Sequence, residues 1–314
     1  MFGKWTKGIF SLTLSAVLLS GTALCSCPVA GGRLAGEAKK TVICIDPGHG
    51  GETEGAKYEY GGEMVMEKDI NLAIALKLEE ELQNYENVEL VLTRTEDTTM
   101  EIQPRVQFAA EHGADYLISV HINACGNGDL SQKGCMVLST VSHYQASGAK
   151  LSDIHGASER LGLAIIERLQ GLGLTLGTEL GAEVNGIVKR PYSPEGNART
   201  TSYYPDGSVA DYYALIRFGV EQGLPAIIIE HAYLSNEAEY YTYLGQEESL
   251  DALARADAEG IADALGLVRK QGSVPAASIQ SVPPVPMPEI FPQAVRKGAK
   301  NYRILRLTGS GQER

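Results

Sequence analysis

Three side chains that can bind a metal or transfer a proton stand at or just past the ends of apolar runs in this sequence. They are His49, His121 and Glu230. Each run has the composition of a buried β-strand. In an open α/β sheet, ligands collect in the crevice outside the carboxyl ends of the strands. We therefore expect these residues, although distant along the chain, to meet in one pocket.

The surroundings of the candidate ligands differ. His121 ends a predicted strand, and Asn123 follows on the same side because side chains alternate along a strand. The buried ring nitrogens of His121 need partners, which a core hydrogen bond or a metal would provide. His49 lies in a glycine-rich turn, where a histidine by itself is more often a surface residue. Glu67 begins a predicted helix, where a carboxylate also interacts favourably with the helix dipole.

Taken together, these residue types indicate a zinc hydrolase. Two histidines and one carboxylate, with a fourth position left for water, form a catalytic zinc site. Zinc lowers the pKa of its bound water and polarises a carbonyl, so that an amide can be attacked at neutral pH. A general base is still needed, and Glu230 at the end of an apolar strand is placed to provide one. Neither a GxSxG nucleophile motif nor a Walker P-loop occurs in the sequence.

Strands and helices are predicted to alternate along the chain, which is typical of a mostly parallel sheet covered by helices. The predicted strands are residues 41–46, 88–92, 115–121, 135–141, 213–218 and 226–230. The predicted helices are residues 68–84, 104–112, 157–172 and about 250–265, with a further helix capped by Ser235 or Asn236. The predicted fold is α/β, a single domain with a twisted, mostly parallel sheet covered by helices on both faces.

Both ends of the 314-residue chain are predicted to lie outside this domain, which spans residues 41–268. Residues 1–30 combine a basic start with a short uncharged apolar stretch, as in a secretory signal, and residues 31–40 form a spacer. We therefore expect the protein to be exported, to the cell envelope or the extracellular space. Residues 269–314 have the composition of a proline-rich linker and a basic tail, which we expect to be disordered.

The cysteines leave two questions open. The residues before Cys27 match a bacterial lipoprotein signal only in part, so a form tethered to a membrane through Cys27 and a freely secreted form are both considered. Cys125 and Cys135 could form a disulfide or remain free thiols. Cys44 is predicted to be a small buried apolar side chain.

Composition disfavours two other classes of function. The net charge of −12 counts against a nucleic-acid binder, because such a protein needs a basic face to neutralise phosphates. A zinc-thiolate site is not expected, because the sequence contains no CxxC pair.

The ordered motifs resemble those of the zinc-dependent N-acetylmuramoyl-L-alanine amidases of the amidase-3 family, which are cell-wall amidases. The resemblance covers about residues 41–266 and rests on IDPGHGG at 45–51, EKD at 67–69, LTR at 92–94, SVHIN at 119–123, and PAIIIE at 225–230 followed by LSN at 234–236. It implies one zinc ion per chain, bound by His49, Glu67 and His121, with Glu230 as the catalytic glutamate. It also implies that peptidoglycan is the substrate, and we expect Asn123 to orient it.

Three departures from the family pattern remain to be explained. His231, followed by Ala and Tyr, stands where the family usually has a small residue followed by Gly and Phe. Glu63 is a rival to Glu67 as ligand, one helical turn earlier, but only Glu67 stands in the Glu-Lys-Asp context. Residues 140–212 form a long insert, of which 173–212 show little periodicity. In some relatives such an insert covers the zinc until an activator protein moves it, so gating and an unknown activator are left open.

Two other functions compete with the amidase. Another exported zinc peptidase acting on cell-wall peptides would share the metal ligands and differ in the shape of its pocket. A non-catalytic wall-binding module would be expected to have lost at least one of the four reactive residues, and this chain retains them all.

Overall fold

The computed structural model describes residues 39–126, 129–177, 182, 184–192 and 202–273. The predicted signal at residues 1–30, the lipid tether at Cys27 and nearly all of the predicted linker and tail lie outside the described residues. Within the described part of the chain, no helix is both long and apolar enough to cross a membrane.

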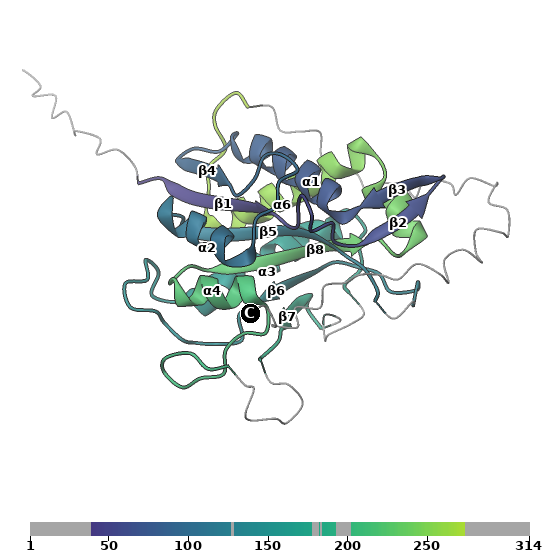
Figure 1. Ribbon diagram of the computed structural model, residues 1–314. Helices are drawn as coiled ribbons and strands as arrows, with labels where there is room; N and C mark the ends of the chain where they lie inside the picture. Colours follow the sequence, from purple (N-terminus) through teal and green to yellow (C-terminus); the bar gives the residue numbers. More distant parts are fainter. Residues whose placement is uncertain (1–38, 127–128, 178–181, 183, 193–201, 274–314) are drawn as a thin grey trace, which may run out of the picture. The chain divides into compact units, whose positions relative to one another are not determined.

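The described strands form a six-stranded sheet in the order β4-β1-β5-β8-β6-β7 (Figure 1). Its strands are β4 (Val88–Leu92), β1 (Thr41–Pro47), β5 (Tyr116–Asn123), β8 (Ala226–Tyr233), β6 (Met136–Ser139) and β7 (Ile187–Lys189). The first four run parallel, β6 is antiparallel to β8, and β7 is parallel to β6. The carboxyl ends of β1, β5 and β8 therefore share one edge of the sheet.

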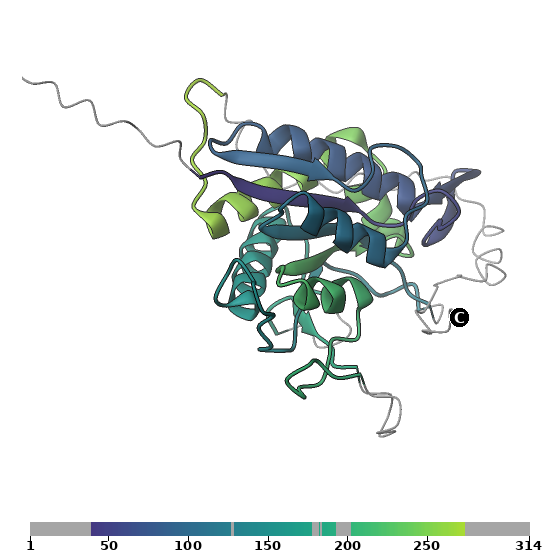
Figure 2. The same cartoon turned by 60° about the vertical axis from the view of Figure 1, so that its left-hand side comes forward.

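Helices cover both faces of this sheet (Figures 1 and 2). One face is covered by α1 (Glu67–Leu82), α3 (Ile154–Gly171) and α6 (Glu247–Leu265), and the other by α2 (Ile102–Glu111) and α4 (Ala214–Glu221). The sheet has a hydrophobic core on each face. Along β1, Ile43 and Ile45 pack in the core under α1, α3 and α6, and Cys44 packs in the core under α2 and α4, because successive side chains point to opposite faces. The predicted fold class is confirmed.

The strand predicted over residues 213–218 is wrong, because this segment belongs to helix α4. Its buried residues are Leu215, Ile216, Gly219 and Val220, which lie on one face of a helix. A short apolar run is compatible with either a buried strand or a buried helix, so local sequence could not decide between them.

Three strands were missed by the sequence prediction. A hairpin of β2 (Lys57–Tyr60) and β3 (Glu63–Met66) precedes α1, and β7 forms the last strand of the sheet. Gly61 and Gly62, which join β2 to β3, both have positive φ, as a tight hairpin turn requires. The adjacent glycines were the available signal for this hairpin.

The insert at residues 140–212 is not one continuous loop. Because β6 runs antiparallel to β8, the residues after Ser139 leave the sheet at the edge opposite the carboxyl ends of β1, β5 and β8. Helix α3 lies within the insert and packs against α6 in the core. A substantial part of the insert is therefore structural.

The described cysteines carry no disulfide. Cys44, Cys125 and Cys135 are all free and buried, so the two thiols considered for pairing remain separate in this structure. Cys44 is fully buried, as predicted.

Beyond β8, the chain makes two short helical turns before α6. Asn236 caps α5 (Glu237–Glu239) by accepting a hydrogen bond from the backbone N–H of Glu239, and a π-helical turn, η1 (Tyr240–Leu244), follows. Asn236, one of the two predicted caps, is thus the residue that begins this helix.

Candidate metal centre and active site

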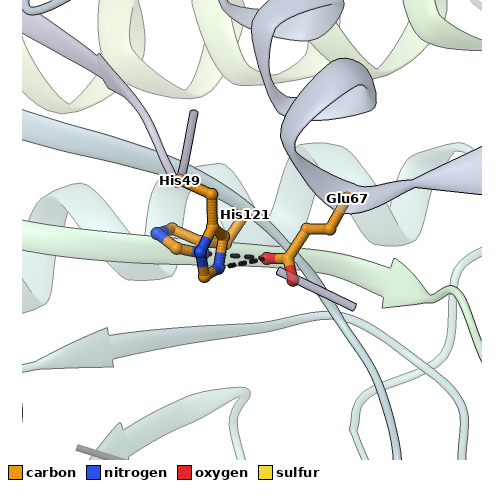
Figure 3. A group of neighbouring side chains, drawn as sticks. All are labelled: His49, Glu67 and His121. Carbon is orange, nitrogen blue, oxygen red and sulfur yellow. Dashed lines mark hydrogen bonds and ion pairs between the residues drawn. The ribbon is translucent and has the colours of Figure 1, made fainter. Parts of the chain in front are cut away.

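His49, Glu67 and His121 meet at the carboxyl edge of the parallel strands, and their side chains point toward one another (Figure 3). The candidate ligand atoms all lie within 4.8 Å of one another. His49 Nε2 is 3.3 Å from Glu67 Oε1, and His121 Nδ1 is 2.9 Å from the same oxygen. Among the described residues, this is the one group of three or more His, Cys, Asp or Glu side chains arranged to hold a metal ion.

The turn after β1 carries His49 into this group. His49 has a φ of 60°, a left-handed conformation that is uncommon for a residue other than glycine. The preceding residue must be small, because a Cβ on Gly48 would lie 2.2 Å from His121 Nε2. Glycine at position 48 therefore lets the turn pass directly against the ring of the second histidine.

Glu67 reaches the group from the first residue of α1. The backbone N–H of Ala56 donates to Glu67 Oε2 at 2.8 Å, and the carboxylate is only 6% exposed. Burial, the largest influence, would raise the pKa of Glu67, but the charge of His49 and hydrogen bonds from both histidines hold it well below its ordinary range. Glu67 is therefore an ionised carboxylate in the position where a cation would bind.

Glu63 does not compete for this position. It is exposed and begins strand β3, so it does not lie one helical turn before Glu67. The β2–β3 hairpin leads directly into α1 and so makes Glu67 the first helical residue.

His121 lies near the end of β5, in register with Glu230 on β8. Burial, the largest influence, lowers the pKa of His121 and favours the neutral imidazole that can bind a metal. Paired residues on neighbouring strands face the same side of a sheet, with the strands about 4.8 Å apart. The register therefore brings Glu230, which is 8% exposed, beside the candidate metal ligands.

A β-bulge follows this pair. Asn123 pairs with Tyr233, so β8 carries one more residue than β5 over this interval. Bulges are frequent next to active sites, because the extra residue changes the direction of the neighbouring side chains.

His231 lies within the bulge and is not part of the candidate metal group of His49, Glu67 and His121. Its Nδ1 is 3.0 Å from the backbone oxygen of His121, and its Nε2 is 2.7 Å from Asp257 Oδ2 on α6. Both side chains are fully buried. Burial, the largest influence, would lower the pKa of His231, but the charge and hydrogen bond of Asp257 raise it. The residue that departs from the family pattern thus links the backbone of a candidate ligand to the helix layer.

Asn123 is 2% exposed and makes its described contacts within the protein. The backbone N–H of Ala124 donates to Asn123 Oδ1 at 2.8 Å, and Asn123 Nδ2 lies 3.9 Å from Met136 Sδ. These contacts shape the chain after β5. A role for Asn123 in orienting substrate stays a prediction.

Glu239, which from the sequence was expected only to suit the positive end of the helix after Asn236, joins two segments at the same edge of the sheet. Its two carboxylate oxygens each accept a backbone hydrogen bond at 2.8 Å, one from Gly134 and one from Tyr233. Burial is the largest influence on this group and raises the pKa of Glu239 to about 7, against the opposing effects of these two N–H groups and of Lys133.

This raised pKa predicts a pH-dependent effect of Glu239→Gln on stability. The folded protein holds a proton on Glu239 up to about pH 7, whereas an unfolded glutamate releases it near pH 4.3. The contribution of Glu239 to stability is therefore largest below about pH 4 and is lost as the pH rises through 7. Relative to Glu239→Gln, wild type should lose about 2 kcal/mol between about pH 5 and about pH 8.

Denaturant unfolding of both proteins at several pH values measures this difference. Groups common to both proteins cancel in the comparison, so a difference that is constant with pH, or that grows in favour of wild type, would contradict the raised pKa.

Comparison with known proteins gives a consistent family match. The sequence profile of a family described as N-acetylmuramoyl-L-alanine amidase matches residues 43–263. The N-acetylmuramoyl-L-alanine amidase AmiC of Escherichia coli O6:H1 is 26% identical over 257 residues, which are 75% of this chain and 56% of the relative. AmiA of Salmonella typhimurium is 27% identical over 274 residues, covering 81% of this chain and 88% of the relative.

A solved structure shares the fold. The N-acetylmuramoyl-L-alanine amidase from Clostridium difficile 630 superposes with a TM-score of 0.52 at 25% identity, covering 73% of this chain and 98% of that one. Relatives differ in overall length, and this chain spans little more than half, 56%, of the E. coli relative.

Proposed function

We propose that this chain, which belongs to the amidase-3 family of N-acetylmuramoyl-L-alanine amidases, is a zinc-dependent hydrolase that cleaves the bond between N-acetylmuramic acid and L-alanine in peptidoglycan. The observation that supports this most directly is the meeting of His49, Glu67 and His121 at one sheet edge, with Glu230 in register beside His121.

The three side chains suit one zinc ion per chain. Two imidazole nitrogens and one carboxylate oxygen are a donor set typical of catalytic zinc, which keeps a fourth position open. The ionised Glu67 and the neutral form favoured at His121 are the protonation states that metal binding requires. When bound, zinc lowers the pKa of a water molecule and polarises a carbonyl group.

Glu230 is the proposed general base. Its carboxylate accepts a proton from the water that attacks the carbonyl carbon of the muramic acid lactyl group. As the carbon–nitrogen bond breaks, the same proton passes from Glu230 to the leaving amine of L-alanine. The products are a muramic acid carboxylate and a peptide with a free amino terminus.

Digestion of purified muropeptides tests this function. The amidase predicts that the stem peptide is released from the sugar with L-alanine at its new amino terminus, as identified by mass spectrometry. Cleavage between amino acids of the stem peptide would instead identify a zinc peptidase. Binding to cell-wall material without any cleavage by the zinc-loaded protein would identify a wall-binding module.

The proposed substrate lies outside the cytoplasmic membrane, in accord with the predicted export of the protein. Labelling with radioactive palmitate and comparison of wild type with Cys27→Ser separates the two forms considered for export. Label that is lost in Cys27→Ser supports the lipid tether, whereas unlabelled protein in the culture medium supports free secretion.

A further inference from the structure

Two buried arginines bind the backbone carbonyls of Pro47, Gly48 and His49, at the start of the turn that carries His49. Arg94 donates from Nε to Pro47 O and from Nη2 to Gly48 O, both at 2.9 Å. Arg105 donates from Nη1 to Pro47 O at 2.7 Å and from Nη2 to His49 O at 2.6 Å. Three consecutive carbonyl groups, including that of His49 itself, are thus bound by the two guanidinium groups.

The same arginines tie this turn to the surrounding elements. Arg94 Nη2 also donates to the backbone oxygen of Lys68, the residue next to Glu67, at 2.8 Å. Arg105, on α2, pairs with Asp46 Oδ1 at 2.7 Å and donates from Nε to Met100 O at 2.8 Å. The turn of His49 and the start of α1 therefore share one rigid support.

Asp46 anchors this support from within β1. Besides Arg105, it accepts hydrogen bonds from Thr93 Oγ1 at 2.5 Å and Ser119 Oγ at 2.6 Å. Asp46 and the two arginines are buried, with exposed fractions of 1%, 4% and 3% for Asp46, Arg94 and Arg105. Water does not compete for these bonds, so they restrain the backbone strongly.

The backbone at His49 needs such a restraint. A left-handed conformation in a non-glycine residue costs on the order of 1–3 kcal/mol and persists only where the surroundings enforce it. A guanidinium group suits this task because its donors have a fixed planar arrangement, whereas the ammonium group of lysine acts as a point charge.

We infer that Arg94 and Arg105 are positioning residues that fix the His49 turn against the start of α1, so that His49 and Glu67 present their ligand atoms together before a metal ion binds. This inference rests on the proposed metal centre at His49, Glu67 and His121. A site that is ordered in advance binds more tightly, because less conformational freedom is lost when the ion arrives.

The test uses Arg94→Lys and Arg105→Lys in the full chain. Arg105→Lys keeps a positive charge beside Asp46, and the described hydrogen bonds of Arg94 go to backbone oxygens, so neither change is expected to leave a buried carboxylate unpaired. Zinc affinity is measured by competition with a chromophoric chelator, at a temperature where circular dichroism shows each variant folded. Supporting partners of metal ligands typically contribute 10–100-fold to affinity, so each variant should bind zinc at least about tenfold more weakly.

Arg255→Lys is the matched control. Arg255 on α6 is a largely buried arginine that pairs with Glu81 on α1 at 3.3 Å, and neither residue contacts the His49 turn. The Arg255→Lys change should lower the melting temperature at most and leave the zinc affinity unchanged. If Arg94 and Arg105 had only a general structural role, their variants would behave like Arg255→Lys, with a lower melting temperature at most and an unchanged zinc affinity.

Two results overturn the inference in different ways. In the first, wild type binds zinc tightly, and folded Arg94→Lys and Arg105→Lys match its affinity within twofold. The proposed metal centre is then supported, but the arginines do not position it. If wild type itself binds no zinc, the proposed metal centre fails, and this inference with it. Should one variant not fold, Arg94→Gln supplies a neutral replacement for the same measurement.

Discussion

Replacing Glu230 by Gln is expected to lower turnover of muropeptides by about 10²–10⁴-fold, the usual contribution of general acid–base catalysis. Glutamine has the size of glutamate and keeps one oxygen, but it cannot accept the proton of the attacking water. Because Glu230 is not among the three candidate metal ligands, the zinc content should stay at that of wild type. Turnover, bound zinc and melting temperature, measured on the same preparation, check this expectation.

A purely structural role for Glu230 predicts the opposite pattern. Removing one member of a buried charged contact lowers stability strongly and has little effect on the chemical step. Glu239→Gln provides a matched control, since Glu239 is also a buried glutamate at this edge of the sheet, and its described side-chain hydrogen bonds are accepted from the backbone N–H groups of Gly134 and Tyr233. Near-normal turnover in a stable, zinc-loaded Glu230→Gln protein would remove Glu230 from the mechanism.

Replacing His121 by Ala should abolish stoichiometric zinc binding and activity together. The change removes one of three candidate ligands, and its effect should exceed the roughly 10–100-fold loss that a supporting partner causes. Metal analysis after gel filtration and a muropeptide assay measure the two losses. His112→Ala, a change at an exposed histidine on the protein surface, should leave both unchanged.

The carboxylate ligand can be assigned by a parallel pair of variants. Glu67→Ala should lose zinc because this carboxylate lies among the ligand nitrogens, whereas Glu63→Ala should retain it because Glu63 is exposed on the hairpin. A His121→Ala protein that keeps its full zinc content, or a Glu67→Ala protein that does so, would require a different ligand set.

Most of the sheet, and the edge where three of the candidate site residues lie, could be predicted from the sequence, for a physical reason. Strands covered by helices on both faces must be apolar almost throughout, so a polar or charged side chain within them is conspicuous. His49 stands just past β1, and His121 and Glu230 stand in the carboxyl-terminal halves of β5 and β8, which parallel pairing brings to one edge. The pattern of apolar residues therefore predicted the edge of the sheet at which the candidate site lies.

The local pattern of apolar residues could not assign the secondary structure where the same residues suit both a strand and a helix. The segment at 213–218 satisfies both a buried strand and a buried helix, and its packing as α4 on the face of the sheet decided the outcome. The Glu-Lys-Asp motif favoured Glu67 over Glu63, but the position of Glu63 on strand β3, and not one helical turn before Glu67, depended on the β2–β3 hairpin.

The sequence by itself determined the candidate site residues, the order of most elements and the edge of the sheet at which these residues lie. Only the tertiary structure revealed how the candidate ligands are held, through Asp257 behind His231 and through Arg94 and Arg105 behind His49. Arg105 donates to a backbone oxygen 56 positions away, and every residue type offers such an oxygen. A bond of this kind leaves no signature in the sequence, because its acceptor is the same at every position and its existence depends on the path of the folded chain.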